Sequence, residues 1–326
     1  MMNVTIEDSL KKALGPELAR LNHSLMEIAR TSGGYLGELL SVVLSGSGKR
    51  VRPSLVFLGA RLGEAPPDVV LGVAEIIELI HIATLVHDDV IDGATLRRGR
   101  KTVVAQHGVD TAVLLGDQIY TQAFERLAKL NQPKILELVS VSAAHTCLGE
   151  IEQLKRRYKF DLSEEDYYSF IERKTAALFG VSVRSGALLA GQSEAVQKAV
   201  ESYGSHMGIA FQIIDDMLDL VGKEDVVGKT LRTDILNGKM TLPLIHFRDS
   251  RGSVGEIEAL FKSLQHPNGH VNQLIKDLKK TGSLDYASAA AKRHVHLAIS
   301  ALAPAPAGEA KDFLAGLADM LLRRTA

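Results

Sequence analysis

Apolar residues recur along much of the chain at intervals of three and four positions, the spacing of one face of an α-helix. Leu18, Leu21 and Leu25 show this pattern near the N-terminus, and a pair of glycines then provides a helix stop. The same pattern predicts helices over residues 70–92, 110–130, 135–157, 164–190, 195–220 and 286–302. No stretch keeps the two-residue alternation that is typical of a half-buried β-strand. We therefore predict an all-α protein.

The chain shows no obvious division into domains. Its 326 residues would by length alone allow two domains, but no Gly/Ser-rich or Pro-rich linker separates them. The prolines fall mostly at the edges of predicted helices, and the longest predicted loop, residues 221–237, is rich in Gly, Lys and Asp. We expect a single domain over residues 1–326, built as one large helical bundle.

Composition narrows the possible functions. The 38 Lys and Arg residues balance 39 Asp and Glu residues, so the basic excess typical of a nucleic-acid-binding protein is missing. A single cysteine, Cys147, rules out an intrachain disulfide and favours a reducing compartment. The sequence shows neither a secretory signal nor an uninterrupted apolar run of about 18 residues. We expect a cytoplasmic protein with no nucleic-acid partner and no membrane anchor.

Two acidic segments of the form DDxxD carry the strongest chemical signal. They are Asp88-Asp89-x-x-Asp92 and Asp215-Asp216-x-x-Asp219, and apolar residues flank both of them. On a helix, residues four apart share a face, so the first and last carboxylates of each segment project together and repel. Mg²⁺ relieves such repulsion, because it binds a few carboxylates together with substrate phosphates. The apolar flanks favour acids that line a cavity over a solvated acidic surface.

Cationic residues that could bind phosphate occur at several separate points of the sequence. They are Lys49, Arg52, Arg97, Arg98, Lys174, Lys229 and Lys239. Arginine binds phosphate through paired hydrogen bonds and lysine acts as a point charge. His81 lies two helix turns before Asp88 and shares its face. A zinc site is disfavoured because the clusters offer oxygen rather than Cys or His ligands. The residues indicate metal-dependent chemistry on a phosphorylated substrate with a hydrocarbon part.

The ordered series of motifs resembles the trans-polyprenyl diphosphate synthases, in particular the long-chain, octaprenyl-type members, and the likeness covers most of the chain. Besides the two aspartate clusters it comprises Gly48-Lys49-Arg50-x-Arg52-Pro53, His81, Arg97-Arg98-Gly99, Gly116-Asp117, Lys174-Thr175, Phe211-Gln212, Gly228-Lys229, Asp234 and Gly238-Lys239-x-Thr241-Leu242-Pro243. The resemblance implies the isoprenoid synthase fold, with the two clusters facing each other across a deep central cavity, and a homodimer. The chain departs from the family at Arg232, where a glycine often stands two residues before the loop aspartate.

The resemblance also implies a role for each site residue. Mg²⁺, about three ions per active site, would be bound by Asp88, Asp92 and Asp215, and Asp89, Asp216 and Asp219 would complete the clusters. The allylic diphosphate would be held by Arg97, Lys174, Thr175, Gln212, Lys229 and Lys239. Isopentenyl diphosphate would be held by Lys49, Arg52, His81 and Arg98. The aspartates, Lys174 and Lys229 would be catalytic in a prenyltransferase of isoprenoid biosynthesis, in which the isopentenyl double bond attacks the carbocation left by the departing diphosphate.

Product length is expected to depend on residues below the first cluster. Thr84 and Ala83 lie four and five positions before Asp88, and Ile80 lies on the next turn. Short-chain members of the family often carry bulky aromatics there. Since the small side chains leave room about one helix turn, ~5.4–7.5 Å, below the cluster, we expect an all-trans product of about C35–C50. A geranylgeranyl or farnesyl diphosphate synthase is the alternative.

Other members of the same fold are disfavoured by the motifs. A terpene cyclase typically replaces the second DDxxD with an Asn/Ser/Glu-type motif, and a squalene-synthase-like enzyme would lack the isopentenyl site at Lys49, Arg52 and His81. The regulatory subunit of a heteromeric prenyl synthase usually loses the aspartates, whereas both clusters are intact here.

Overall fold

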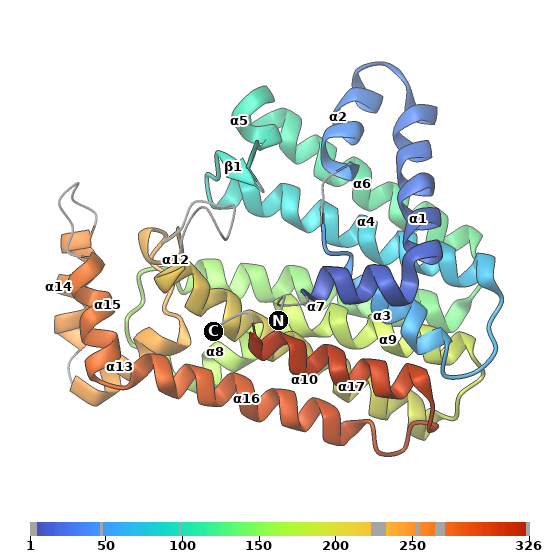
Figure 1. The fold of residues 1–326 in the computed structure, drawn as a ribbon. Coiled ribbons are helices and arrows are strands. Elements are labelled where there is room, and N and C mark those ends of the chain that lie inside the picture. The colour runs from blue at the N-terminus through green and yellow to red at the C-terminus, as the bar shows by residue number, and fades with distance from the viewer. Residues whose placement is uncertain are drawn as a thin grey trace.

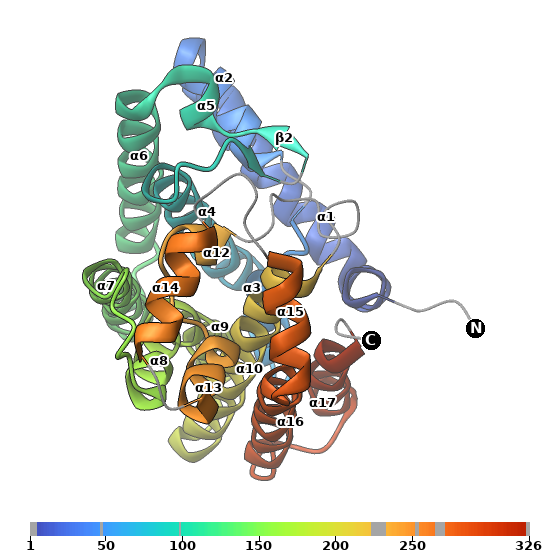
Figure 2. The same ribbon diagram turned by 90° about the vertical axis from the view of Figure 1, so that its left-hand side faces the viewer.

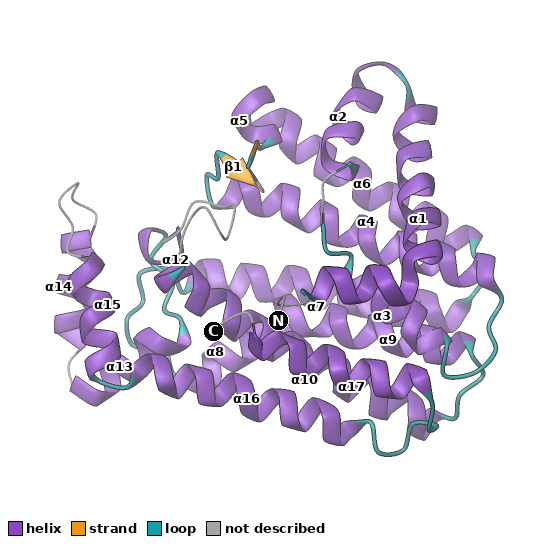
Figure 3. Cartoon of the chain, in the orientation of Figure 1, coloured by secondary structure: helices purple, strands orange, loops and turns teal. Residues whose placement is uncertain are grey.

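The computed structural model describes residues 5–45, 48–97, 99–222, 233–251, 254–264 and 271–323. Helices form nearly all of its regular structure (Figure 3), which confirms the all-α prediction. The described strands, β1 (Leu96–Arg97) and β2 (Arg100–Lys101), form one short antiparallel ribbon. Four residues singled out in the sequence, Arg98, Gly228, Lys229 and Arg232, lie outside the described residues.

The helices follow one another in a bundle around a buried interior (Figure 1). The N-terminal half contains α1 (Ile6–Ser32), α2 (Gly34–Leu44), α3 (Val51–Ala60), α4 (Pro67–Ile91), α5 (Val103–His107), α6 (Val109–Lys129) and α7 (Pro133–Lys155). The C-terminal half contains α8 (Glu164–Ile171), η1 (Glu172–Ala176), α9 (Ala177–Leu189), α10 (Glu194–Val221), α12 (Thr233–Leu236), α13 (Leu242–Arg251), α14 (Val254–Leu264), α15 (Val271–Lys280), α16 (Ser283–Ala301) and α17 (Glu309–Leu322). One cluster of buried apolar side chains extends from Ile6 in α1 to Leu321 in α17.

The two helices that carry the acidic clusters, α4 and α10, run through the interior. In α4, Ile76, Ile77 and Ile80 are almost completely buried. Among the described helices only α4 is long and apolar enough to cross a membrane, but 67% of its most apolar window is buried inside the protein, as in the core helix of a soluble protein. The two glutamates that interrupt its apolar sequence are buried but form ion pairs, Glu78 with Arg50 and Glu75 with Arg126.

Close helix crossings fix the position of the interior helices. At the crossing of α3 and α9, a Cβ added to Gly59 would lie 2.2 Å from the carbonyl oxygen of Val183, and one added to Gly186 would lie 2.1 Å from that of Val56. Only glycine lets the two backbones approach this closely. This contact brings the start of α3, which carries Arg52, next to the helices of the C-terminal half.

The predicted helix 164–190 is divided into α8, a single π-helical turn η1, and α9. A π turn inserts one extra residue into a helix and is frequently found at functional sites. The apolar period of the sequence does not reveal such an insertion, since the helix continues on both sides of it. The turn contains Lys174 and Thr175.

Candidate active site

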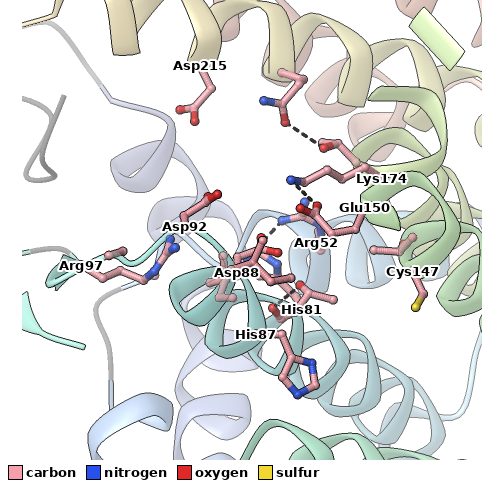
Figure 4. A pocket seen from close by; sticks show the side chains of 18 of the residues that line it. Arg52, His81, His87, Asp88, Asp92, Arg97, Cys147, Glu150, Lys174 and Asp215 are labelled. Carbon is pink, nitrogen blue, oxygen red and sulfur yellow. Dashed lines mark hydrogen bonds and ion pairs between the residues drawn. The ribbon is translucent and has the colours of Figure 1, made fainter. Parts of the chain in front are cut away.

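A cavity of about 1220 Å³ lies between α4, α7, η1 and α10. Asp88 and Asp92 reach it from the end of α4, and Asp215 reaches it from α10 on the opposite side (Figure 4). The predicted site residues that line it are Lys49, Arg52, His81, Thr84, Asp88, Asp92, Arg97, Lys174, Thr175, Gln212, Asp215 and Lys239. Residues that are distant in the sequence therefore meet in one space, with acids and cations on its walls.

The three aspartates of the first cluster have different surroundings. Asp88 faces the cavity, and burial raises the pKa of its carboxyl group. Asp89 is buried and accepts hydrogen bonds from the guanidinium of Arg97 at 2.7 Å. Burial also raises the pKa of Asp89, although Arg97 acts in the opposite direction. Asp89 is thus held in place by a cation, whereas Asp88 points into the space where a ligand can bind.

Asp92 sits among cations at the C-terminal end of α4. The Nζ atom of Lys239 lies 3.0 Å from its Oδ1, and Arg157, in the turn that follows α7, forms a second ion pair with it. Burial alone would raise the pKa of Asp92, but the positive charge of Lys239 and its neighbours outweighs burial and lowers this pKa. Asp92 is therefore ionised at neutral pH, which a metal ligand requires.

The second cluster is organised by a chain of hydrogen bonds. Asp215 faces the cavity, while Asp216 is buried behind it. Asp216 accepts two hydrogen bonds of 2.7 Å, one from the Tyr167 hydroxyl and one from Nε2 of Gln212. The Oε1 atom of Gln212 in turn accepts a hydrogen bond of 2.8 Å from the Thr175 hydroxyl. Burial, with the nearby charge of Asp234, raises the pKa of Asp216 to about 7. These hydrogen bonds connect η1 to α10 and fix the positions of the residues that border Asp215.

Asp219 is completely buried, and it contacts the segment that begins at Thr233. Its carboxylate accepts hydrogen bonds of 3.2 Å from the backbone N–H of Asp234 and from the hydroxyl of Thr233. These groups lie at the beginning of α12. The third aspartate of this cluster therefore anchors a neighbouring segment, which also carries Asp234, 3.3 Å from Nζ of Lys239.

The donor set of the cavity fits Mg²⁺. Asp88, Asp92 and Asp215 offer carboxylate oxygens, the ligands that Mg²⁺ prefers. The raised pKa of Asp88 reflects burial and, to a smaller extent, the repulsion of Glu150 and Asp92, which a divalent cation would relieve. Within the described part of the chain, no group of three His, Cys, Asp or Glu side chains is already close enough to hold a metal. Such an open arrangement suits a cation whose coordination shell is completed by the phosphates of the substrate.

Lys174 projects from the π turn toward the space between the two clusters (Figure 4). It pairs with Glu150 and donates a hydrogen bond of 3.0 Å to Oε1 of Gln153, both on α7. Burial would lower the pKa of Lys174, but the carboxylates of Asp88 and Glu150 outweigh burial and raise it well above its usual value. Lys174 is therefore a permanently charged group beside the aspartates.

A second cationic corner forms where α3 begins. The Nη1 atom of Arg52 lies 3.2 Å from Nε2 of His81, and the guanidinium lies over the ring of Phe179, 4.5 Å from its centre. Arg50 also borders the cavity but is largely buried, and it pairs with Glu78 and donates a hydrogen bond to the carbonyl of Leu44 at 2.9 Å. Arg50 has a positive φ of 49°. This left-handed residue stands between Lys49 and Arg52, which line the cavity on either side of it.

The lower part of the cavity is mostly apolar or small. It is lined by Thr84 of α4, Tyr120 and Phe124 of α6, and Ala143, Ala144 and Cys147 of α7. Ala83 and Ile80, also expected there, are fully buried in the core, and neither is among the described residues that line the cavity. Of the residues expected to face the product, the structure therefore places Thr84 at the cavity.

Several residues of the site were not identified from the sequence. Glu150 and Gln153 contact Lys174 from α7, and Arg157 contacts Asp92 from the turn that follows α7. The fourth residue, Tyr167, contacts Asp216 from α8. The first three lie at positions i, i+3 and i+7, so they form a polar line on one face of the predicted helix 135–157. That spacing could have revealed them, whereas no local pattern distinguishes Tyr167.

The sequence and the fold were compared with those of known proteins. A family model described as polyprenyl synthetase matches residues 34–278. The octaprenyl diphosphate synthase of Escherichia coli (strain K12) is 32% identical over 319 residues, 97% of this chain and 98% of the relative. Component 2 of the heptaprenyl diphosphate synthase of Geobacillus stearothermophilus is 36% identical over 305 residues, 94% and 95% of the two chains. A crystal structure of a polyprenyl synthase from Caulobacter crescentus CB15, complexed with calcium and isoprenyl diphosphate, superposes with a TM-score of 0.92 at 32% identity, covering 98% of each chain.

Proposed function

The chain belongs to the polyprenyl synthetase family, and from this membership we propose that it condenses isopentenyl diphosphate with an allylic diphosphate in a Mg²⁺-dependent reaction. Its fold is the isoprenoid synthase fold of that family. The observation that carries the proposal is the placement of Asp88 and Asp215 on opposite sides of one cavity whose walls also hold Lys174 and Arg52. Acids and cations in one pocket suit a polyanion that is bridged to the acids by metal ions.

The upper part of the cavity is suited to bind and ionise the allylic diphosphate. Bound to Asp88, Asp92 and Asp215, Mg²⁺ supplies positive charge where negative charge develops on the leaving diphosphate. Lys174, Lys239 and Arg97 line the same region and add fixed positive charge. The Thr175 hydroxyl is oriented by Gln212 and borders the space between the clusters. These groups favour departure of the diphosphate and formation of the allylic carbocation.

The second substrate is assigned to the corner at the start of α3. Lys49, Arg52 and His81 line the cavity there and carry the charge and hydrogen-bonding groups that a second diphosphate needs. The double bond of isopentenyl diphosphate attacks the carbocation, a C–C bond forms, and a proton is lost. We assign that proton to the departing diphosphate, the strongest base the reaction itself produces next to the new cation. The reaction requires that water, which would quench the carbocation, be kept away from it.

The growing chain is assigned to the lower part of the cavity, and we propose an all-trans product of about C35–C50, since a small residue stands one helix turn below the first cluster. Thr84 stands at this position, next to Ala143 and Ala144 of α7. The relatives named octaprenyl and heptaprenyl diphosphate synthase support a product of this class. A geranylgeranyl diphosphate synthase is the alternative, because solved structures of that name also share the fold.

We propose that the protein acts as a cytoplasmic homodimer through α6 and α7, which lie along one edge of the molecule (Figure 2). These helices expose large apolar side chains, namely Val109, Val113, Leu114, Leu136, Val141, Leu148, Ile151 and Leu154. Large exposed apolar patches commonly mark protein interfaces. Sedimentation of a Leu114→Glu/Leu148→Glu variant tests the assignment. We expect a monomer, with Leu297→Glu on α16 remaining dimeric as the control.

The decisive experiment is to incubate the purified chain with isopentenyl diphosphate, an allylic diphosphate and Mg²⁺, and to size the products by chromatography. Long polyprenyl diphosphates that vanish when EDTA is added are the expected result. A product of the geranylgeranyl class would overturn the long-chain assignment alone. Cyclic hydrocarbons would indicate a terpene cyclase, and no product from the chain alone would indicate the subunit of a heteromeric enzyme.

A further inference from the structure

Glu150 places a further acidic side chain in the cavity, separate from the two aspartate clusters. It projects from α7, lines the cavity and pairs with the ammonium group of Lys174 (Figure 4). Its side chain is 15% exposed and that of Lys174 is 19% exposed, so solvent screens this ion pair only weakly. An additional carboxylate beside a phosphate-binding lysine is unexpected, because it competes with the phosphate for the same charge.

The backbone around this pair is built for close contact. A Cβ added to Gly149 would lie 2.7 Å from the backbone nitrogen of Lys174 and 3.0 Å from Cβ of Arg173. Only a glycine at this position lets α7 lie directly against the π turn η1. The backbone of Lys174 is thus fixed, and the direction of its long side chain depends on the groups at its end. Those groups are Glu150 and Gln153, one helix turn apart on α7.

Asp88 is the alternative partner for the Lys174 ammonium. The negative charges of both Asp88 and Glu150 act on Lys174, so the ammonium lies within the field of both acids. Asp88 already exerts the larger charge effect on Lys174, and Glu150 opposes it by adding a direct hydrogen-bonded ion pair to its own charge. Without the charge of Glu150, the pull of Asp88 would no longer be balanced. An ammonium bound to Asp88 would occupy the carboxylate proposed to bind metal, and would leave the position from which Lys174 can reach a diphosphate.

We infer that Glu150 is a positioning residue that holds Lys174 away from Asp88, so that Lys174 stays available for the allylic diphosphate and Asp88 for the metal. This inference rests on the proposed function, since it concerns the same site. It assigns no proton transfer to Glu150. The neighbouring acid Glu152 provides a matched comparison, because it pairs with Arg173 of the same π turn at 2.6 Å but is not among the described residues that line the cavity.

A double-mutant cycle tests the inference by direct binding. We would measure, by calorimetry in the presence of Mg²⁺, the affinity of an allylic thiolodiphosphate, which resists ionisation. Glu150→Gln should weaken binding about 10-fold, the size expected for one charge-assisted hydrogen bond that is misdirected. The same substitution should change affinity less than about 2-fold in a Lys174→Met background, because there is then no ammonium to position. Glu152→Gln should bind the analogue as the wild type does.

Two outcomes would overturn the inference. One is unchanged affinity in Glu150→Gln, and the other is an equal loss with and without Lys174. Glu150→Asp, which keeps the charge on a shorter side chain, should show a smaller loss than Glu150→Gln and provides a second variant if the first folds poorly. Turnover of the wild-type protein is measured separately. Prenyl products from the wild type would support the proposed function even if Glu150 proved unimportant, and their absence would refute the proposal that this chain catalyses the reaction alone, independently of Glu150.

Discussion

The hydroxyl of Tyr167 donates a hydrogen bond of 2.7 Å to Oδ2 of Asp216, directly behind the second acidic cluster. The other carboxylate oxygen accepts its bond from Gln212. Both oxygens of a buried acid are therefore satisfied by partners on two elements, α8 and α10. A buried carboxylate without such partners is costly, so this pair stabilises the packing of α8 on α10 as well as the geometry of the site.

Replacing Tyr167 with Phe should lower the free energy of unfolding by about 1–3 kcal/mol, because Oδ2 of Asp216 loses its partner in the interior. The aromatic ring is kept, so packing changes little. Urea unfolding measures the loss. Tyr35→Phe is the control, since Tyr35 is 56% exposed and its substitution should change stability by less than about 0.5 kcal/mol. Equal effects of the two variants would contradict a structural role for the Tyr167–Asp216 bond.

Asp88→Asn and Asp215→Asn should each reduce turnover by about 100-fold or more while leaving the protein folded. Both side chains line the cavity, and an amide has the shape of a carboxylate without its charge. Steady-state kinetics at saturating Mg²⁺ and a thermal unfolding curve are the measurements. Asp319→Asn, at an exposed position on α17, is the control and should keep full activity. Near-normal turnover in both cavity variants would refute the assignment of the site.

The sequence was sufficient to predict the elements whose signal is local. The apolar period marked α4 and α10 within three residues of their ends, and the spacing within each DDxxD segment placed its acids on those helices. It could not distinguish Asp88, which faces the cavity, from Asp89, which is turned toward Arg97. That distinction depends on which neighbours surround each face of the helix.

Contacts between distant positions account for most of what the sequence did not reveal. Arg157 pairs with Asp92, 65 residues earlier, and such a partner has no signature in a single sequence. The extra residue of η1 is equally hidden, because the helical pattern continues through it. A similar reason explains why the sequence did not show that Thr84 lines the cavity and Ala83 does not. Both are small neighbours on α4, but only the three-dimensional packing decides which of them meets the cavity.

Thr84→Phe should shorten the product. Thr84 lines the cavity one turn below Asp88, so an aromatic ring there would block the path of the growing chain. Ala83→Phe should act differently, because Ala83 is fully buried in the core. We expect that variant to be destabilised by about 1–3 kcal/mol through overpacking. Product chromatography and thermal unfolding of both variants separate the two effects. Unchanged products from a folded Thr84→Phe variant would show that the chain grows in another direction.

A pair of histidines joins α10 to α16 away from the cavity. The Nδ1 atoms of His206 and His294 lie 3.1 Å apart, and the ring of Tyr168 packs against His294. This contact requires one nitrogen to donate and the other to accept, so it is lost when both carry protons. Burial lowers the pKa of both histidines, and burial together with the charges of His206 and Arg293 lowers the pKa of His294 to about 4. The charge of Glu172 opposes the shift at His206.

The stability of the protein should therefore fall as the pH is lowered from the ordinary histidine pKa of 6.5 toward 4. In this range the unfolded chain takes up protons that folded His206 and His294 resist, so acid favours unfolding. Because both side chains are partly exposed, we expect a loss of only about 1–2 kcal/mol. Urea unfolding at about pH 5 and pH 7.5 measures this loss. His294→Gln should flatten the dependence, whereas His296→Gln, at an exposed position on the same helix, should leave it unchanged. Equal pH dependence in the wild type and His294→Gln would assign acid sensitivity to other groups.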